Sequence, residues 1–507
     1  MKYFIMNISK IAKNLHYSLL SQIITIFLGL VIPRLILVGY GSETNGLLNS
    51  VAQVIIYLNL FEAGVQLVAV QSLYKPVSMD DKESINGILS AVNRNYKKTG
   101  AVYMGMLLMI ALVYPYLIAD CGLNYWTVCG VVLFSGLGNV VLFFFQGKYK
   151  ILLQAEGKNY ILTNLQTIIA VLNNGTKIIC IALGYDVLVV VVASFVISLL
   201  QTGYIWLLIR KKYSWIDLNS DPDYDAIAQR NSALVHQLAG MVFQNTDVLI
   251  ITCFCGLKVV SVYSIYKLIT SHLGSLLNSL YGSISFALGQ KFNTDRKAFS
   301  AIIDTVDVYF GGISFSVYTV TAILFLPFVE LYTRGIADIA YSDKTICLLF
   351  VVIELLTFAR LPMLNTINYA GHFQNTLPQT LIETSINLII SLTAVRFLGI
   401  YGVLLGTVGA LIYRDIEVFL YTNHRILNRS ARKTFFIYCV DALVFILILF
   451  AITTIPITVT SYFDFVKAGL ILMPAVTLIY LSVLSFFFSG EKREVLRLAK
   501  ETIQKLH

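Results

Sequence analysis

The hydrophobic pattern of this chain consists of long apolar runs that recur from one end to the other. A helix needs about 20 predominantly apolar residues to cross roughly 30 Å of hydrocarbon, and about fourteen runs approach or exceed that length. The predicted spans are 15–38, 46–73, 100–119, 125–146, 160–183, 187–209, 233–256, 260–284, 303–328, 344–364, 378–396, 400–422, 434–456 and 466–488. Short alternating segments typical of a transmembrane β-barrel are absent from the sequence. The pattern predicts an all-α polytopic membrane protein.

Composition and charge support this class. Of the 507 residues 57% are hydrophobic and 13% are charged, against roughly 25% charged in soluble proteins. The net charge of +9 is explained by topology and not by nucleic acid, because basic residues collect in cytoplasmic loops. Most of the 37 Lys and Arg fall on one side if the N-terminus is inside, so both termini are predicted to be cytoplasmic. The seven cysteines lie in or beside apolar runs, which favours small core residues over metal or disulfide roles.

No soluble domain interrupts the spans. The longest inner loops are predicted at 74–99 and 210–232, and the longest outer loop at 329–343. The tail Glu491–His507 reads as a basic amphipathic helix on the inner membrane surface, or alternatively as a solvated end.

An internal repeat is indicated by two pairs of segments. GKNYILTNLQTIIAVLNNG from Gly157 aligns with GHFQNTLPQTLIETSINLI from Gly371, so that Asn173 falls on Asn387. LILVGYGSETNGL aligns loosely with LIITCFCGLKVVSVY after Asp247, with nearly the same offset. The sequence thus predicts two six-helix lobes, 1–215 and 216–430, related by a pseudo-two-fold axis along the membrane normal. Residues 431–507 would add two helices and the tail.

Charged residues lie inside the predicted spans, where a charge costs about 2.5–3.5 kcal/mol on insertion scales and usually faces a cavity or another charge. The embedded cations are Arg34, Lys177, Lys267, Arg360 and Arg414. The embedded acids are Glu62, Asp247, Glu354, Glu383, Asp415 and Glu417. Each residue has two readings. It is either half of a structural ion pair, as Arg414 and Glu417 at i, i+3 allow, or part of a polar chamber.

A chamber with five cations suits an anion, above all a phosphate or diphosphate, where Arg supplies paired donors and Lys a point charge. The five cations are therefore the predicted substrate-binding residues, and Asp247 and Glu383 the predicted sites of proton or cation coupling. No phosphate-binding loop is present, the Asp221–Asp225 acids read as a solvated linker, and no histidine has ligand spacing, so no catalytic residue, cofactor or metal is predicted. Gly402 and Gly406 form G-x-x-x-G, a signal of close helix packing.

Several stretches resemble the polysaccharide flippases of the multidrug/oligosaccharidyl-lipid/polysaccharide exporter superfamily. They are PRLILVGYGSETNGLLNS from Pro33, KYKILLQAEGKNY from Lys148, NTDVLIIT from Asn245 and YAGHFQNT from Tyr369. The resemblance implies a secondary transporter in a bacterial inner membrane that moves undecaprenyl-diphosphate-linked oligosaccharide to the outer leaflet by alternating access, as in O-antigen or capsule synthesis. It also implies that cationic residues of the cavity bind the diphosphate. Among the five cations, Arg34 fits this role best because of its position in the first span. Membrane lipids and a glycan polymerase are the implied further partners.

Three alternatives stay open. A drug or toxin exporter on the same fold predicts an acidic cavity for organic cations, which the five cations oppose. A membrane glycan polymerase or ligase predicts a sizeable outer loop, which the chain lacks. A structural scaffold needs no charged interior.

Overall fold

The computed structural model describes residues 2–118, 122–227, 245–452, 459–495 and 497, and within these ranges the regular structure is entirely helical. This confirms the all-α class. The chain forms two compact units, Met1–Ser261 and Val262–His507. The predicted division into two six-helix lobes and a C-terminal pair of helices stays a prediction.

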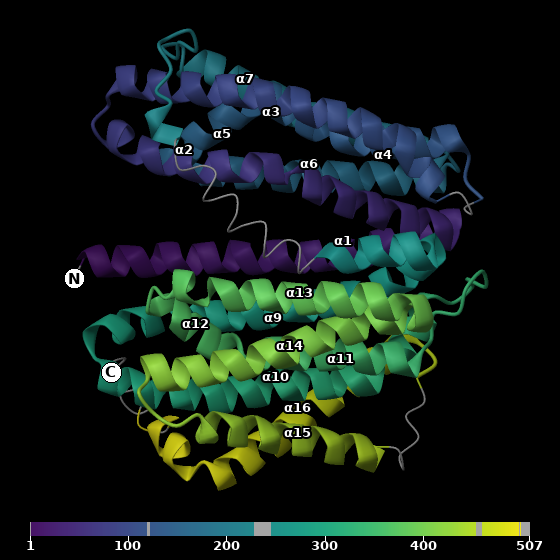
Figure 1. Ribbon diagram of the computed structural model, residues 1–507, viewed down its shortest axis with the longest axis vertical. Helices are drawn as coiled ribbons and strands as arrows, with labels where there is room; N and C mark the ends of the chain where they lie inside the picture. The colour runs from purple at the N-terminus through teal and green to yellow at the C-terminus, as the bar shows by residue number, and fades with distance from the viewer. Residues whose placement is uncertain (1, 119–121, 228–244, 453–458, 496, 498–507) are drawn as a thin grey trace. The chain divides into compact units, whose positions relative to one another are not determined.

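The first unit contains a long first helix and a set of helices packed around α3 and α4 (Figure 1). Its helices are α1 (Lys2–Leu58), α2 (Leu60–Ser78), α3 (Lys82–Leu117), α4 (Tyr125–Val141), the π-helix η1 (Leu142–Gln146), α5 (Gly147–Ala155), α6 (Asn159–Ala182), α7 (Val187–Lys212), the 3₁₀-helix η2 (Asp225–Ile227) and the short apolar helix Asn245–Cys255. Its core is built on aromatic rings: Phe143 lies 5.2 Å from Tyr103 and 5.8 Å from Tyr96 between ring centroids.

The second unit is organised around α10, which packs against α11, α15 and α16, while α13 and α14 lie against each other (Figure 1). Its helices are α9 (Leu257–Thr294), which begins in the first unit, α10 (Arg296–Tyr332), α11 (Lys344–Ala359), α12 (Leu361–Tyr369), α13 (Phe373–Leu398), α14 (Ile400–Tyr421), the π-helix η3 (Thr422–Ile426), α15 (Arg432–Ile452) and α16 (Tyr462–Phe487). Arg360 sits at the break between α11 and α12, two residues before Pro362.

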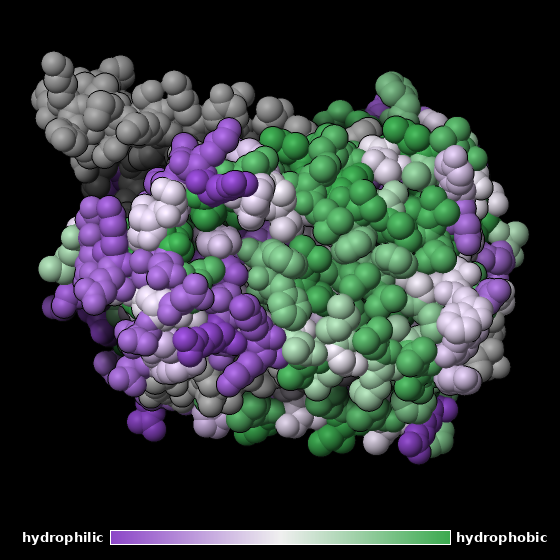
Figure 2. Space-filling view, turned by 90° about the horizontal axis from the view of Figure 1, so that it is seen from above, coloured by the Kyte–Doolittle hydropathy of each residue, from purple (hydrophilic) through white to green (hydrophobic). Residues whose placement is uncertain are grey.

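The exterior has the character of a membrane protein. Among the described residues nine helices are long and apolar enough to span a bilayer. Figure 2 shows a broad band of hydrophobic side chains on one face, with hydrophilic side chains gathered mainly beside it. Large apolar residues such as Leu112, Leu200 and Trp206 are exposed on these helices, which is stable when the solvent is hydrocarbon. The chain is a multi-pass membrane protein. Most of the tail predicted to form a surface helix lies outside the described residues, as does the beginning of the predicted span 233–256.

One predicted loop is wrong. Residues 74–99 are mostly helical, because α2 continues to Ser78 and α3 begins at Lys82. Asp81 caps α3: its carboxylate accepts from the Ser84 amide over 3.1 Å and from the Ser84 hydroxyl over 2.6 Å. The charges at 82–98 mark the part of a long helix that extends beyond the apolar run, since α3 has 36 residues and a bilayer crossing needs about 20.

Glycines with left-handed backbone recur at the predicted repeat offset. Gly157 and Gly371, 214 residues apart, have φ of 71° and 72°. Gly41 and Gly256, 215 apart, have φ of 80° and 83°, and the same offset relates Gly184 to Gly399. Because such φ values strongly favour glycine, three coincidences at offsets of 214 or 215 support a duplicated chain path.

Candidate functional site

Close packing of α13 on α14 creates the frame of the most highly charged buried site. A Cβ at Gly402 would lie 2.5 Å from the backbone carbon of Ala394, and one at Gly406 would lie 2.3 Å from Ser391 Oγ. One turn on, Asn387 donates its amide to the Thr407 hydroxyl over 2.9 Å. The G-x-x-x-G prediction is confirmed, and the helices approach closely enough for side chains further along them to meet.

Those side chains form an ion network, here called the α11–α14 network, consisting of Arg360, Glu383, Arg414, Asp415 and Glu417. Arg360 donates to Glu383 Oε1 over 2.7 Å, and Arg414 Nε lies 3.5 Å from Glu383 Oε2. Arg414 also pairs with Glu417, and Arg360 Nε lies 3.9 Å from Asp415 Oδ1. The side chains of Arg414 and Glu383 are 5% and 6% exposed, so each charge is stabilised mainly by the other and not by water.

The charge balance of this network matters for function. Two guanidinium groups face three carboxyl groups, so its cations are compensated in the structure. An anionic ligand would reach Arg360 or Arg414 only by replacing a carboxylate. Glu383 is the group that it would replace, because each of its oxygens faces one of the arginines. The sequence assigned Arg360 and Arg414 to binding and Glu383 to coupling; the structure brings the three together.

Lys267 lies elsewhere in the second unit, half-buried on α9. Its Nζ lies 5.5 Å from the centroid of the Tyr263 ring, a cation–π arrangement. On α11, Glu354 accepts from the Tyr318 hydroxyl over 3.1 Å. This embedded acid is thus held by a phenol on α10.

The remaining predicted residues are in the first unit. Arg34 is half-buried on α1, directly after Pro33, and Lys177 is half-buried on α6. Asp247 is buried in the helix Asn245–Cys255, with 5% exposure. Within the described part of the chain Lys177 has no carboxylate at ion-pair distance. Its charge is therefore better suited to an external anion than those of the α11–α14 network.

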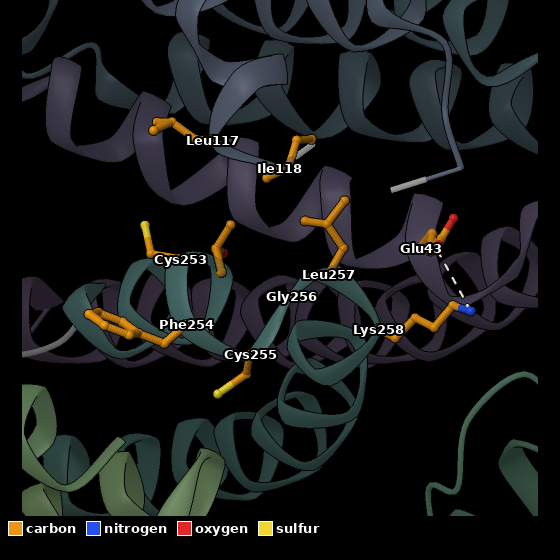
Figure 3. A pocket seen from close by; sticks show the side chains of 10 residues that line it. Glu43, Leu117, Ile118, Cys253, Phe254, Cys255, Gly256, Leu257 and Lys258 are labelled. Atoms are coloured by element: carbon orange, nitrogen blue, oxygen red, sulfur yellow. Dashed lines mark ion pairs between the residues drawn. The ribbon is translucent and has the colours of Figure 1, made fainter. Parts of the chain in front are cut away.

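A pocket of about 400 Å³ opens in the first unit near the break in α1 at Gly41. Figure 3 shows Leu117 and Ile118 on one side of it and the segment 253–257 on the other. At its rim Lys258 Nζ lies 3.6 Å from Glu43 Oε1. Cys253 and Cys255 are free thiols in the structure. None of the five predicted binding cations lines this pocket.

Sequence reasoning missed three buried charged groups. Lys148 follows the π-helix η1 and is 6% exposed, with Nζ donating to Asn93 Oδ1 over 2.7 Å. Asp307 and Asp441 are both 0% exposed on α10 and α15. Both aspartates are acids inside predicted spans, Asp307 beside Asp304 in 303–328 and Asp441 alone in 434–456, which is the same signal that identified Asp247. Lys148 lies between the predicted spans 125–146 and 160–183 together with other lysines, and nothing in the sequence distinguishes it from them.

Comparison with known proteins places this fold. The structure is similar to "Lipid II flippase MurJ, inward closed conformation", with a TM-score of 0.70 and 14% identity over 94% of this chain and 99% of that one. It is also similar to an inward-facing multidrug resistance MATE family transporter of the MOP superfamily, with a TM-score of 0.60 and 16% identity over 80% and 95% of the chains. No protein-family model and no curated protein sequence matches. The chain has the fold that these two transporters share.

Proposed function

We propose that this protein is a flippase that moves an undecaprenyl-diphosphate-linked oligosaccharide from the cytoplasmic to the outer leaflet of a bacterial inner membrane by alternating access. The glycan is of the type used in O-antigen or capsule synthesis. The observation that carries this proposal is the likeness to a lipid II flippase over 99% of that chain's length, since lipid II is itself a lipid-linked substrate. Buried guanidinium groups, which suit phosphate, add to it.

The α11–α14 network suggests how binding and coupling are joined. When Glu383 is ionised, its carboxylate forms ion pairs with both Arg360 and Arg414. Protonation of Glu383 removes that charge, so a diphosphate can take its place between Arg360 and Arg414, which keep Asp415 and Glu417 as their remaining acids. Return of the proton to water then restores the ion pairs and expels the anion. Glu383 thereby links one proton to one substrate, and Asp247 stays a second candidate for coupling.

Lys177, Arg34 and Lys267 are the proposed cations that meet the substrate without displacing an acid of this network. A charge-assisted hydrogen bond is worth about 1.5–3 kcal/mol, which corresponds to about a ten- to hundredfold change in affinity. Loss of one of these cations is therefore expected to raise the substrate concentration needed for half-maximal transport by that factor.

The second candidate is a multidrug exporter, favoured by the likeness to a MATE transporter. Such a protein would use the acids Asp247, Glu383 and Asp415 to receive organic cations. The difference between the two functions lies in the sign of the ligand's charge, and this is directly measurable.

The test is reconstitution into liposomes that carry undecaprenyl-diphosphate oligosaccharide in the inner leaflet. Its arrival in the outer leaflet is followed with a lectin or a glycosidase. Wild type is expected to translocate it, and Lys177→Ala and Arg34→Ala to be impaired about ten- to hundredfold. Lys344→Ala is the matched control, because this lysine is exposed at the beginning of α11. If wild type moves no lipid-linked glycan but exports organic cations, the exporter replaces the flippase.

Glu383→Gln tests the coupling step separately. Glutamine imitates the protonated acid, so substrate binding is expected to persist while transport loses its response to an imposed pH gradient. Normal acceleration of Glu383→Gln by the gradient would remove Glu383 from this role.

A further inference from the structure

Two carboxyl groups lie near each other in the interior of the second unit, and neither takes part in the ion pairs of the α11–α14 network. Asp307 lies on α10 and Asp441 on α15, and both residues are 0% exposed. Tyr438, one turn before Asp441, donates its hydroxyl to Asp307 Oδ1 over 2.6 Å. Gly311, one turn after Asp307, allows Asp441 to lie against α10: a Cβ there would be 3.3 Å from Asp441 Oδ2. The two acids and the phenol form one cluster, here called the α10–α15 carboxyl pair.

The hydrogen bonding of this pair is incomplete. Among the described residues Asp307 Oδ2 and both carboxyl oxygens of Asp441 have no hydrogen-bond donor. No Lys, Arg or His of the described chain is at ion-pair distance from either acid. A buried ionised carboxylate without a cation or donors costs far more than a neutral acid, and two such charges together cost more still.

The nearest cations are already engaged. Arg429 and Lys433 each lie 2.5 Å from a carboxylate oxygen of Asp304, one turn from Asp307 towards the beginning of α10. Lys433 also pairs with Glu491. The other titratable groups facing the pair are Tyr281 on α9, Asp415 on α14 and Tyr480 on α16. Tyr480 donates to Thr319 or accepts from it over 2.9 Å, and lies 3.5 Å from the Asp441 carbonyl, so it does not serve the Asp441 carboxyl group.

We propose that the α10–α15 carboxyl pair is a binding site for one exchangeable proton. Asp307 is the ionised member, because the Tyr438 hydroxyl stabilises its carboxylate, and Asp441 carries the proton on the carboxyl oxygen nearer to Asp307. A metal cation fits poorly, since oxygen-ligated cations take about six or more ligands and this pair supplies two carboxyl groups and a phenol. No group of three metal-ligating side chains occurs among the described residues.

Exchange with water takes place at the charged end of the pair. Lys433 and Asp441 are eight residues apart on α15, which is about 12 Å along a helix. The ion cluster of Asp304, Arg429, Lys433 and Glu491 lies at that end. A proton released by Asp441 passes by way of Asp307 towards this cluster, leaving the pair with two negative charges until it is loaded again. Use of this step to drive transport rests on the proposed function, whereas proton binding itself does not.

The experiment is infrared difference spectroscopy on the full-length protein in lipid nanodiscs, perfused with acidic and alkaline buffer. The carbonyl stretching band of a protonated carboxyl group is expected in wild type, shifted in heavy water and lost at alkaline pH. Asp441→Asn is expected to lose this band. Asp307→Asn removes the neighbouring charge, so its band should disappear at a lower pH than in wild type. Asp304→Asn is the matched control, because this acid is held as a carboxylate by two cations.

Tyr438→Phe provides an independent variant that keeps the ring and removes the donor to Asp307. It is expected to gain a second protonated carboxyl band, because Asp307 then loses the bond that favours its ionised form. The inference is overturned if wild type shows no such band, if Asp441→Asn retains it unchanged, or if sodium in place of potassium abolishes it at constant pH. A band that behaves as expected in a protein that translocates nothing would refute the proposed function and leave the proton site standing.

Discussion

Arg360 donates to Glu383 Oε1 over 2.7 Å, and the other oxygen of the same carboxylate lies 3.5 Å from Arg414 Nε. One carboxyl group on α13 therefore bridges guanidinium groups from the α11–α12 break and from α14. Glu383→Ala would remove the acid nearest to Arg360 and leave it only Asp415, 3.9 Å away, in a buried site, and we expect it to lower the free energy of unfolding by about 3–5 kcal/mol. Chemical unfolding in mixed micelles measures this difference.

The control for this prediction is the double variant Arg360→Met, Glu383→Leu. It removes one cation together with the acid and fills the space with apolar atoms, so it should be more stable than Glu383→Ala. If the double variant is less stable than the single one, Glu383 does not act by neutralising Arg360.

The helical class and nearly all helix positions follow from the sequence because lipid imposes one rule. Backbone groups in hydrocarbon must be hydrogen-bonded internally, so an apolar run of sufficient length can only be a helix. The rule does not apply to the parts of helices that extend beyond the bilayer. Residues 82–99 read as a loop because they are charged, although Asp81 and Ser84 begin a helix there. A hydropathy pattern responds to the charges of the lysines and does not detect a capping residue such as Asp81.

The candidate site was predictable only as a list of residues. The sequence shows that Arg360, Glu383 and Arg414 are embedded, but their pairing depends on how α11, α13 and α14 pack. Gly406 against Ser391 sets that packing, and the spacing G-x-x-x-G indicates closeness without naming the opposite helix. Asp307 and Asp441 are far apart in sequence, and nothing local relates them.

Gly402→Ala is expected to destabilise the second unit. Its Cβ would lie 2.5 Å from a backbone atom of α13, which no rotamer change relieves, so the helices must separate. Overpacking of this kind costs about 1–3 kcal/mol. Gly203→Ala on α7 is the matched control: no atom lies within 4 Å of its Cβ position, and alanine should be neutral or more stable by up to about 1 kcal/mol. Thermal unfolding of both variants compares them, and equal effects would contradict close packing at Gly402.

Acid is expected to loosen the beginning of α3. Hydrogen bonds from the Ser84 hydroxyl and amide lower the pKa of Asp81 below its usual 3.8. A carboxyl group whose folded pKa is lowered stabilises the fold above its unfolded pKa, and this contribution is lost as the pH falls through the folded value. Amide exchange of residues 82–85, corrected for its intrinsic pH dependence, should therefore be slow above pH 3.8 and accelerate below it. Asp81→Ala should exchange fast at both pH values; protection equal to wild type in this variant would show that the cap contributes nothing.

Gly41→Ala and Gly256→Ala are expected to be destabilising for the same reason, because both glycines have a positive φ. Gly41 has φ 80° and ψ 178°, a region open essentially to glycine alone, and Gly256 has φ 83°. At Gly256 no atom lies within 4 Å of the Cβ position, so only backbone strain opposes alanine there. Strain of this kind costs about 1–3 kcal/mol, which unfolding of each variant measures. Gly282→Ala is the matched control, because it lies inside α9 in a helical conformation with equally open space. If Gly256→Ala is as stable as Gly282→Ala, the left-handed turn is not required, and the correspondence between the two halves of the chain loses one of its three pairs.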